Sequence, residues 1–567
     1  MSARVAAHLI VEGRIATLAG QEGWGWRDAL AIADGRVAGV AHVGRRHELD
    51  NLRGPPTVRW RLPPGVLVLP GITDAHLHLM MLALARTQLD LTDAPTLPAT
   101  LAALAAAHRR RVAAGDTDGW LLGHGWSLHR LGQWPDAAML EAACPRRPVA
   151  LYAHDHHSRW VSGRALELAG VGAGTADPEG GLIRRDEAGE PTGILHETAS
   201  GLVDDAVPDP PAELIETALV EQAAELATLG IVGCHDPGEL TRQPRIRRGP
   251  LLYRALAERG RLPLRVHASI RASELEHAIE LGLRSGDGVA SPAGDRVAGR
   301  LAERYRMGWL KLFADGSLGS RSAALLAPYS DAAVNPPTGG PRGMFLEPPD
   351  ELADQLRRAG AAGISGQLHA IGDAAVRVAL DLLAGQPALS LRPRIEHAQL
   401  VDPADVARFG ALRVAASVQP VHLRSDADPA RTAWGERSEN AFPLAALVAG
   451  GALIPFGTDA PVEPPDPWPG IAVAIWRRHP DHPGDPPLGA QHALGLLRAV
   501  RAACLDPALV AGVADAGRLT PGCRADLIVV PADGFDESAD AAALAATRPL
   551  ATLIDGEVVH RDARFDP

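Results

Sequence analysis

Lysine is almost absent from this chain of 567 residues, because Lys311 is the one lysine among its 56 basic residues. The abundance of Ala, Arg, Gly and Pro suggests a GC-rich coding background in which Arg replaces Lys wherever it will serve. A surviving lysine is therefore a candidate for a role that Arg cannot fill, since a buried amine can lose its proton and a guanidinium cannot. The apolar residues around it, 309–313, predict burial.

Cysteine, long apolar runs and an excess of basic residues are also lacking. The four cysteines lie far apart and form no CxxC pair, which is typical of a reduced protein without disulfides. No apolar stretch approaches the roughly 20 residues that a membrane span needs, and the N-terminus has no signal-peptide core. A net charge of −12 argues against nucleic acid or an anionic membrane as a partner. We therefore expect a cytoplasmic protein that binds neither.

Short β-segments are predicted at both ends of the chain. Residues 1–65 contain apolar runs around an Asp34-Gly35 turn, and residues 506–567 contain a strand at 525–530 and a hairpin at Asp555-Gly556. Asp-Gly between apolar runs is a strong hairpin signal. Because each piece is too small to bury its own core, we expect them to pair in one composite β-sandwich domain that brings the termini together.

Between these segments, residues 66–505 alternate strand-like apolar runs with helical segments rich in Ala and Leu. Repeated β–α alternation indicates parallel strands, so the expected fold class is α/β with a (β/α)8 barrel of the TIM type. The segment is longer than the roughly 250 residues of a typical barrel. We therefore place an inserted small α/β subdomain at residues 90–205, where residues 180–195 predict a separate hairpin.

The apolar run at residues 66–69 continues through Pro70-Gly71 to two histidines, His76 and His78. On a strand, residues two apart point to the same face, whereas on a helix they lie roughly 200° apart. Two imidazoles side by side suit a divalent metal. A single HxH pair is a weak indication, because polar residues also follow many ordinary strands.

Other polar residues occupy the ends of later predicted strands, where (β/α)8 barrels build their active sites. Taken singly, each has a structural explanation: a histidine at a strand end is commonly hydrogen-bonded, and an aspartate there can be a turn residue. A buried lone amine, however, is costly unless it is paired, neutral or chemically modified. Together these residues predict a site for one or two divalent metals. They are His76, His78, Lys311, His369, His397 and Asp459.

The order His-x-His, Lys, His, His, Asp resembles that of the metal-dependent amidohydrolase superfamily. The local strings resemble its amidohydrolase-3 branch, which contains the YtcJ-like proteins and N-substituted formamide deformylase. The resemblance covers nearly the whole chain. The matching strings are residues 70–78, 311–321, 369–373, 396–401, 457–462 and 517–527.

The resemblance implies a role for each of the six residues. The HxH pair would bind a first metal, His369 and His397 a second, and a carboxylated Lys311 would bridge the two. Asp459 would ligate the first metal and act as the catalytic general base. Zinc is the default by ligand preference, although iron, manganese and a single occupied site remain open. A small-molecule amide substrate and a homodimer are further implications of the family.

Four more residues are candidates for substrate binding. His157 and Trp160 lie in a string that resembles a family motif ending in His-Ser-x-Trp, and ordinary packing explains Trp160 equally well. His422 follows a predicted strand and could lie at the mouth of the site. Asp315 continues the Lys311 strand into a loop, where it could contact substrate, support a ligand histidine or form a turn.

The residues and the resemblance together predict a metal-dependent hydrolase of a non-peptide carbon–nitrogen bond, in an amide or an N-substituted formamide. The implied mechanism is attack by a metal-bound hydroxide, with proton transfer by Asp459. A deaminase or a lactone/ester hydrolase is the alternative, because the fold does not fix the substrate. A deaminase of the adenosine type usually has Glu shortly after the third histidine, where this chain has His369-Ala370-Ile371-Gly372-Asp373. A non-catalytic assembly protein should have lost ligands, and this chain has all six.

Overall fold

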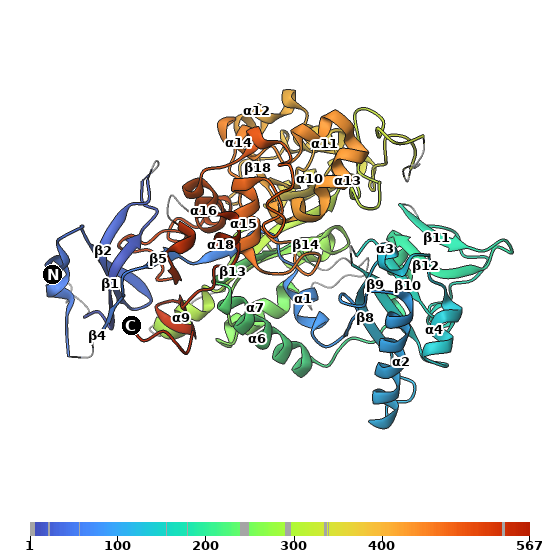
Figure 1. Ribbon diagram of the computed structural model, residues 1–567, viewed down its shortest axis with the longest axis horizontal. Coiled ribbons are helices and arrows are strands. Elements are labelled where there is room, and N and C mark those ends of the chain that lie inside the picture. Colours follow the sequence, from blue (N-terminus) through green and yellow to red (C-terminus); the bar gives the residue numbers. More distant parts are fainter. Residues whose placement is uncertain are drawn as a thin grey trace.

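The computed structural model describes residues 6–20, 23–55, 57–154, 156–178, 180–238, 249–289, 296–333, 337, 339–535 and 539–567. The chain is a mixed α/β protein with three sheets (Figure 1). In that view a sheet near both termini lies at the left, a parallel sheet at the centre and a six-stranded sheet at the right. Within the described residues, no helix has the length and apolar character needed to cross a membrane.

An eight-stranded sheet combines strands from both ends of the chain. The two sets join where β5 pairs antiparallel with β19, with Val68 opposite Val529. Its two Asp-Gly hairpins both place Asp and Gly at positive φ, at 50° and 74° for Asp34-Gly35 and at 54° and 74° for Asp555-Gly556. Positive φ at both turn residues is typical of type I′ turns. The strands are β1 (Leu9–Ala16), β2 (Trp26–Ala33), β3 (Arg36–Ala41), β4 (Val58–Arg61), β5 (Val66–Pro70), β19 (Leu527–Pro531), β20 (Ala551–Ile554) and β21 (Glu557–Arg561).

The central sheet has seven parallel strands in the order β6-β13-β14-β15-β16-β17-β18. Nearly every residue of these strands is buried, as expected for a parallel sheet covered on both faces. The strands are β6 (Ile72–Asp74), β13 (Ile231–Asp236), β14 (Arg265–Arg271), β15 (Tyr305–Phe313), β16 (Gly366–Ala370), β17 (Arg394–His397) and β18 (Ala415–Ser417). The helices between and after them include α6 (Ala212–Thr228), α7 (Pro250–Glu258), α8 (Leu275–Glu280), α9 (Arg296–Ala302), α10 (Pro349–Ala361), α11 (Asp373–Leu383), α12 (Pro403–Leu412), α13 (Leu423–Trp434), α14 (Leu444–Ala449), α15 (Pro467–Trp476), α16 (Leu496–Cys504), α17 (Asp506–Val510) and α18 (Ala541–Ala545).

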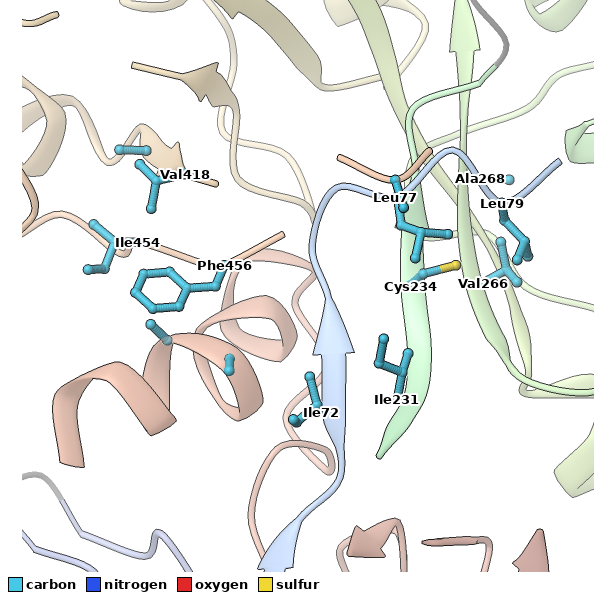
Figure 2. Packing of buried hydrophobic residues seen from close by; sticks show 14 of the residues in the cluster. Ile72, Leu77, Leu79, Ile231, Cys234, Val266, Ala268, Val418, Ile454 and Phe456 are labelled. Carbon is cyan, nitrogen blue, oxygen red and sulfur yellow. The ribbon is translucent and has the colours of Figure 1, made fainter. Parts of the chain in front are cut away.

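Residues 453–460 connect the two edge strands of the central sheet. On the β18 side, the backbone N–H of Gly457 donates to Val418 (3.1 Å). On the β6 side, the N–H of Ala75 donates to Phe456 (2.8 Å). Figure 2 shows the side chain of Ile72 on β6 between Ile231 of β13 and the segment that carries Phe456. The parallel sheet therefore curls so that one segment hydrogen-bonds beside both of its edge strands, which gathers the carboxyl ends of its strands.

The six-stranded sheet comes from the stretch between α1 (Leu79–Ala85) and α6, in the order β11-β12-β10-β9-β8-β7. Its β11–β12 hairpin lies where residues 180–195 predicted one. Helices α2 and α4 pack on it around a core that includes Trp126 and Trp160. The elements are β7 (Leu89–Asp90), β8 (Leu121–Trp126), β9 (Val149–Ala153), β10 (Ser158–Val161), β11 (Gly181–Arg185), β12 (Pro191–Glu197), α2 (Leu97–Ala113), α3 (Leu128–Leu131), α4 (Ala137–Ala143) and α5 (Gly163–Leu168).

The run that leads to the HxH pair differs from its prediction. It forms two strands in two sheets, because β5 pairs in the terminal sheet and only β6 belongs to the parallel one. The change occurs at Gly71, whose N–H donates to Asp526 of the terminal sheet (3.0 Å), while the next N–H, of Ile72, donates to Gly230 (3.0 Å). A Cβ at Gly71 would lie 2.5 Å from the side chain of Val232. Only glycine lets the chain pass so close between the sheets.

Candidate metal centre

His76, His397 and Asp459 form a group of side chains that could hold a metal ion. Each offers a ligand atom within 4.8 Å of the others. The Nε2 atoms of His76 and His78 lie 3.3 and 3.4 Å from Oδ1 of Asp459. All four side chains are buried. Two imidazoles and one carboxylate thus converge at the carboxyl end of the parallel sheet, with His78 beside the carboxylate.

An unusual backbone lets Glu396 and His397 serve the same cluster. Consecutive residues of a regular strand point to opposite faces. The φ of His397 is 71° and that of Ala398 is 42°, so the chain turns through the left-handed region as β17 ends. As a result Glu396 reaches Nδ1 of His76, while the ring centroid of His397 lies 5.1 Å from that of His76. Asp459, with a φ of 64°, is also left-handed. Such residues each cost on the order of 1–3 kcal/mol and are typical of functional sites.

His369 and Lys311 lie beside this group. The ring centroid of His369 is 4.5 Å from that of His397, and its Nε2 lies 3.1 Å from the carbonyl oxygen of Gly316. Lys311 is fully buried on β15, next to the strand of His369. Burial, with a smaller contribution from Arg271, lowers the pKa of Lys311 to about 7 against the opposing effect of Glu396. The six residues predicted as ligands all line one cavity of about 580 Å³.

The donor set fits a divalent metal. Nδ1 of His78 lies 2.6 Å from the carbonyl of Gly238, and Nδ1 of His76 contacts the carboxylate of Glu396. Both partners accept hydrogen bonds, so both Nδ1 atoms carry a proton, and both Nε2 atoms point toward Asp459. The buried Nδ1 of His397 has no hydrogen-bond partner in the described part of the chain. Imidazole and carboxylate donors of this kind suit zinc, iron or manganese.

A buried polar layer lies under the histidines and fixes their orientation. Glu396 accepts hydrogen bonds from Gln367 Nε2 (3.0 Å) and Arg394, and Arg394 also donates to the carbonyl of Ala75 (2.6 Å). Although burial acts to raise it, Arg394 and His76 hold the pKa of Glu396 well below its ordinary value. Glu396 is therefore a carboxylate that holds His76 in one tautomer.

Glu396→Gln is expected to weaken metal binding by about 10- to 100-fold, because a carboxylate that orients a ligand histidine typically contributes that much. Metal affinity would be measured by competition with a chelator of known affinity, on protein shown to be folded by circular dichroism. Glu347→Gln is the matched control, since Glu347 lines the cavity without a contact to a ligand histidine among the described residues. Equal metal affinities for both variants would contradict this role of Glu396.

His422 lies beside Asp459, and Glu463 lies on the other side of His422. Nε2 of His422 lies 3.2 Å from Oδ2 of Asp459, and its Nδ1 lies 3.6 Å from Oε1 of Glu463. Burial acts to lower the pKa of His422, but these two carboxylates raise it to about 10. Burial likewise acts to raise the pKa of Asp459, but His76, His422 and His78 hold it well below its ordinary value. The pair therefore consists of an imidazolium and a carboxylate.

The four substrate-binding candidates divide into two pairs. His157 and His422 line the cavity, and Nδ1 of His157 lies 2.8 Å from Oε2 of Glu197. Trp160 is buried in the core of the six-stranded sheet, where its Nε1 donates to the carbonyl of Asp136 (2.8 Å). Asp315 is fully buried outside the cavity lining, with its Oδ1 3.7 Å from Nε2 of His369, as expected for a residue that supports a ligand histidine. It accepts backbone hydrogen bonds of 2.9 Å from residues 324, 371 and 372, which shapes the loop after His369.

Sequence reasoning gave no role to several residues that the structure places at the site. His154, His156 and Arg271 line the cavity, and Arg394 and Glu396 lie beneath it. The Arg-x-Glu spacing on an otherwise apolar strand was a usable signal, because residues two apart share one face. No comparable signal marked the others, since their position depends on how the six-stranded sheet and β14 meet the cavity.

Strand-end histidines, a buried lysine and an aspartate around one cavity are typical of metal-dependent hydrolases. The model of the amidohydrolase family matches residues 64–560, and the chain belongs to that family. The chain is 29% identical to YtcJ of Bacillus subtilis (strain 168) over 539 residues, covering 94% of this chain and 96% of that protein. It is 25% identical to N-substituted formamide deformylase of Arthrobacter pascens over 545 residues, covering 93% and 94%.

A solved structure supports the same assignment. An uncharacterized metal-dependent hydrolase from Pyrococcus horikoshii OT3 aligns with a TM-score of 0.71 at 26% identity, covering 92% of this chain and 97% of that one. The family resemblance predicted from the motifs is therefore confirmed.

Proposed function

We propose that this protein is a metal-dependent hydrolase that cuts the non-peptide carbon–nitrogen bond of a small amide or N-substituted formamide. The observation that carries the proposal is the place of Asp459, whose carboxylate lies within 3.4 Å of two histidine Nε2 atoms and contacts His422. A carboxylate there can accept a proton from the attacking water and return it to the leaving amine. The relationship to N-substituted formamide deformylase supports the choice of bond.

One or two divalent ions, zinc by donor preference, would be held by the four histidines, Asp459 and a carboxylated Lys311. When bound, such an ion supplies Lewis acidity that polarises a carbonyl group. The chain supplies the rest. Asp459 holds and moves the proton, and His422, kept protonated by Glu463 and Asp459, fixes the orientation of Asp459. The cavity, of about 580 Å³, has room for a small-molecule substrate.

The architecture that we infer for this function is a (β/α)8 barrel over residues 66–505, with an insertion at residues 90–205. The seven parallel strands and the segment at residues 453–460 that joins their edges support this interpretation. Residues 1–65 and 506–567 would form the composite β domain, which the pairing of β5 with β19 supports. Catalytic residues at the carboxyl ends of strands are what such a barrel requires.

The test is a substrate panel run on protein of known metal content. Purified protein would be analysed for bound metals and assayed with N-substituted formamides, acyl amines, lactones and aminopurines. We expect at least one equivalent of a divalent metal and release of amine from the formamides or acyl amines, abolished by a chelator. Activity confined to lactones or aminopurines would move the protein to the alternative reaction class. If the purified protein contains no metal and is inactive on every compound of the panel, the hydrolase proposal is wrong.

A further inference from the structure

Arg271 lies at the carboxyl end of β14, directly beside the candidate metal centre. In the parallel register of β14 and β15 it is paired with Lys311. Both side chains line the same cavity. Two paired residues on neighbouring strands thus bring a candidate metal ligand and a permanent cation to the same cavity. The mechanism proposed above gives no task to this guanidinium.

The Arg271 guanidinium has no counter-ion among the described residues. No ion pair involves it there, and its buried Nη1 has no hydrogen-bond partner. The nearest charges are Glu347 and Glu274, and the Glu274 carboxylate accepts a hydrogen bond from the backbone N–H of Arg271 (2.7 Å). Burial outweighs both carboxylates and lowers the pKa of Arg271 to about 10. The half-buried side chain faces the cavity, so an anion that enters the cavity can pair with this guanidinium.

Phe313 sets the distance between this cation and the reaction centre. The Cζ atom of Arg271 lies 4.2 Å from the centroid of the Phe313 ring, and Nζ of Lys311 lies 4.7 Å from the same centroid. The ring also stacks on His369, with centroids 5.2 Å apart. The guanidinium, the Lys311 amine and the His369 ring therefore all lie against one aromatic ring. A substrate anion bound by Arg271 would therefore lie close to the amide bond that is cut at the metal centre.

We propose that Arg271 binds a carboxylate of the substrate, and that the substrate class is therefore small anionic amides of the N-acyl or N-formyl amino acid type. This inference rests on the proposed hydrolase function and names its substrate class. The planar guanidinium offers paired N–H donors that match the two oxygens of a carboxylate. Phe313 packs against the guanidinium, and the pairing of Arg271 with Lys311 across the two strands favours a carboxylate close to the scissile amide.

The test compares N-formylphenylalanine with N-formyl-2-phenylethylamine, which contain the same scissile bond and differ only in the carboxylate. We expect wild-type protein to show a kcat/KM about 10- to 100-fold higher for the anionic compound, the range of charge-assisted hydrogen bonds. Arg271→Gln should remove this preference, chiefly through KM, so that the two compounds are hydrolysed at similar kcat/KM. Arg271→Lys should keep part of the preference for the carboxylate, because lysine retains the positive charge but lacks the paired N–H donors of a guanidinium.

Three measurements separate recognition from structure and from turnover. Arg254→Gln, on the exposed surface of α7, is the matched control and should keep the preference. The Tm of Arg271→Gln should stay within a few degrees of wild type, since no ion pair is lost. Calorimetric titration of both compounds into the Asp459→Asn variant, with and without Arg271→Gln, measures carboxylate preference without turnover.

The outcomes distinguish this inference from the proposed function. Hydrolysis of both compounds at equal kcat/KM, or an equal loss for both in Arg271→Gln, would overturn the carboxylate site while leaving the hydrolase in place. Carboxylate-selective binding that Arg271→Gln abolishes, without hydrolysis of either compound, would support the carboxylate site and count against amide hydrolysis.

Discussion

Asp459→Asn is expected to lower kcat by about 10²- to 10⁴-fold, the usual contribution of a positioned general base. The amide keeps the size of the side chain and its contact with His422, but it cannot accept the proton of the attacking water. The wild-type group is a carboxylate throughout the neutral range, because His76, His422 and His78 hold its pKa well below the ordinary value. The measurement is steady-state kcat on the best substrate of the panel.

The metal content of the variant must accompany its kcat, because Asp459 is also a candidate ligand. A loss of kcat at unchanged metal content assigns the effect to proton transfer. Asp426→Asn is the matched control, since Asp426 is a half-buried acidic residue of the cavity that interacts with Gln399 and His422 and contacts no candidate ligand histidine in the described structure. It should change kcat by less than tenfold. A fully active Asp459→Asn variant would remove the proposed mechanism.

The positions of the six candidate ligands could be predicted because they depend on a local pattern. Five of them lie in or shortly after an apolar run that forms a strand, and parallel strands gather their carboxyl ends at one edge. Asp459 follows an apolar run that forms no regular strand but hydrogen-bonds beside both edge strands of the sheet. Lys311, His369 and His397 therefore lie around one cavity although 58 and 28 residues separate them in sequence. The sequence also predicted that Lys311 is buried among apolar residues and is paired, neutral or modified, because an unpaired buried ammonium is costly.

The remaining features depend on contacts between distant segments, which no local pattern encodes. The left-handed turn at His397 brings Glu396 to His76, a residue 320 positions away. The division of the HxH run between two sheets depends on Val232 packing against Gly71. Trp160 and Asp315 were candidates for substrate binding on the same grounds as His157. The side chain of Trp160 instead packs in a core, and that of Asp315 accepts hydrogen bonds from backbone amides. Residue type selects candidates, and the tertiary packing decides which of them face the cavity.

Lys311→Arg is expected to lower the affinity for metal and the kcat/KM. Each should fall by more than the roughly 100-fold that follows the loss of a residue that only orients a metal ligand. Arginine keeps the positive charge and approximate bulk, but a guanidinium does not form a stable carbamate. The carbamate of Lys311 would present two oxygens to two metals, as a bridging carboxylate does. Metal analysis and kcat/KM of the purified variant measure the effect. Unchanged values for both would refute a bridging carbamate.

Chemical rescue and pH separate a carbamate from a merely structural lysine. Lys311→Ala leaves space for a small carboxylate, so acetate or formate should restore part of the metal binding and activity, whereas chloride at equal ionic strength should not. Carbamate formation needs the neutral amine, which adds CO2 and releases one proton. Because burial and Arg271 lower the pKa of Lys311 to about 7, the neutral fraction rises from pH 6 to pH 8. Reactivation of metal-free wild-type protein by zinc should therefore require bicarbonate and proceed further at pH 8 than at pH 6. Reactivation that is independent of bicarbonate would mean that Lys311 acts as a free amine.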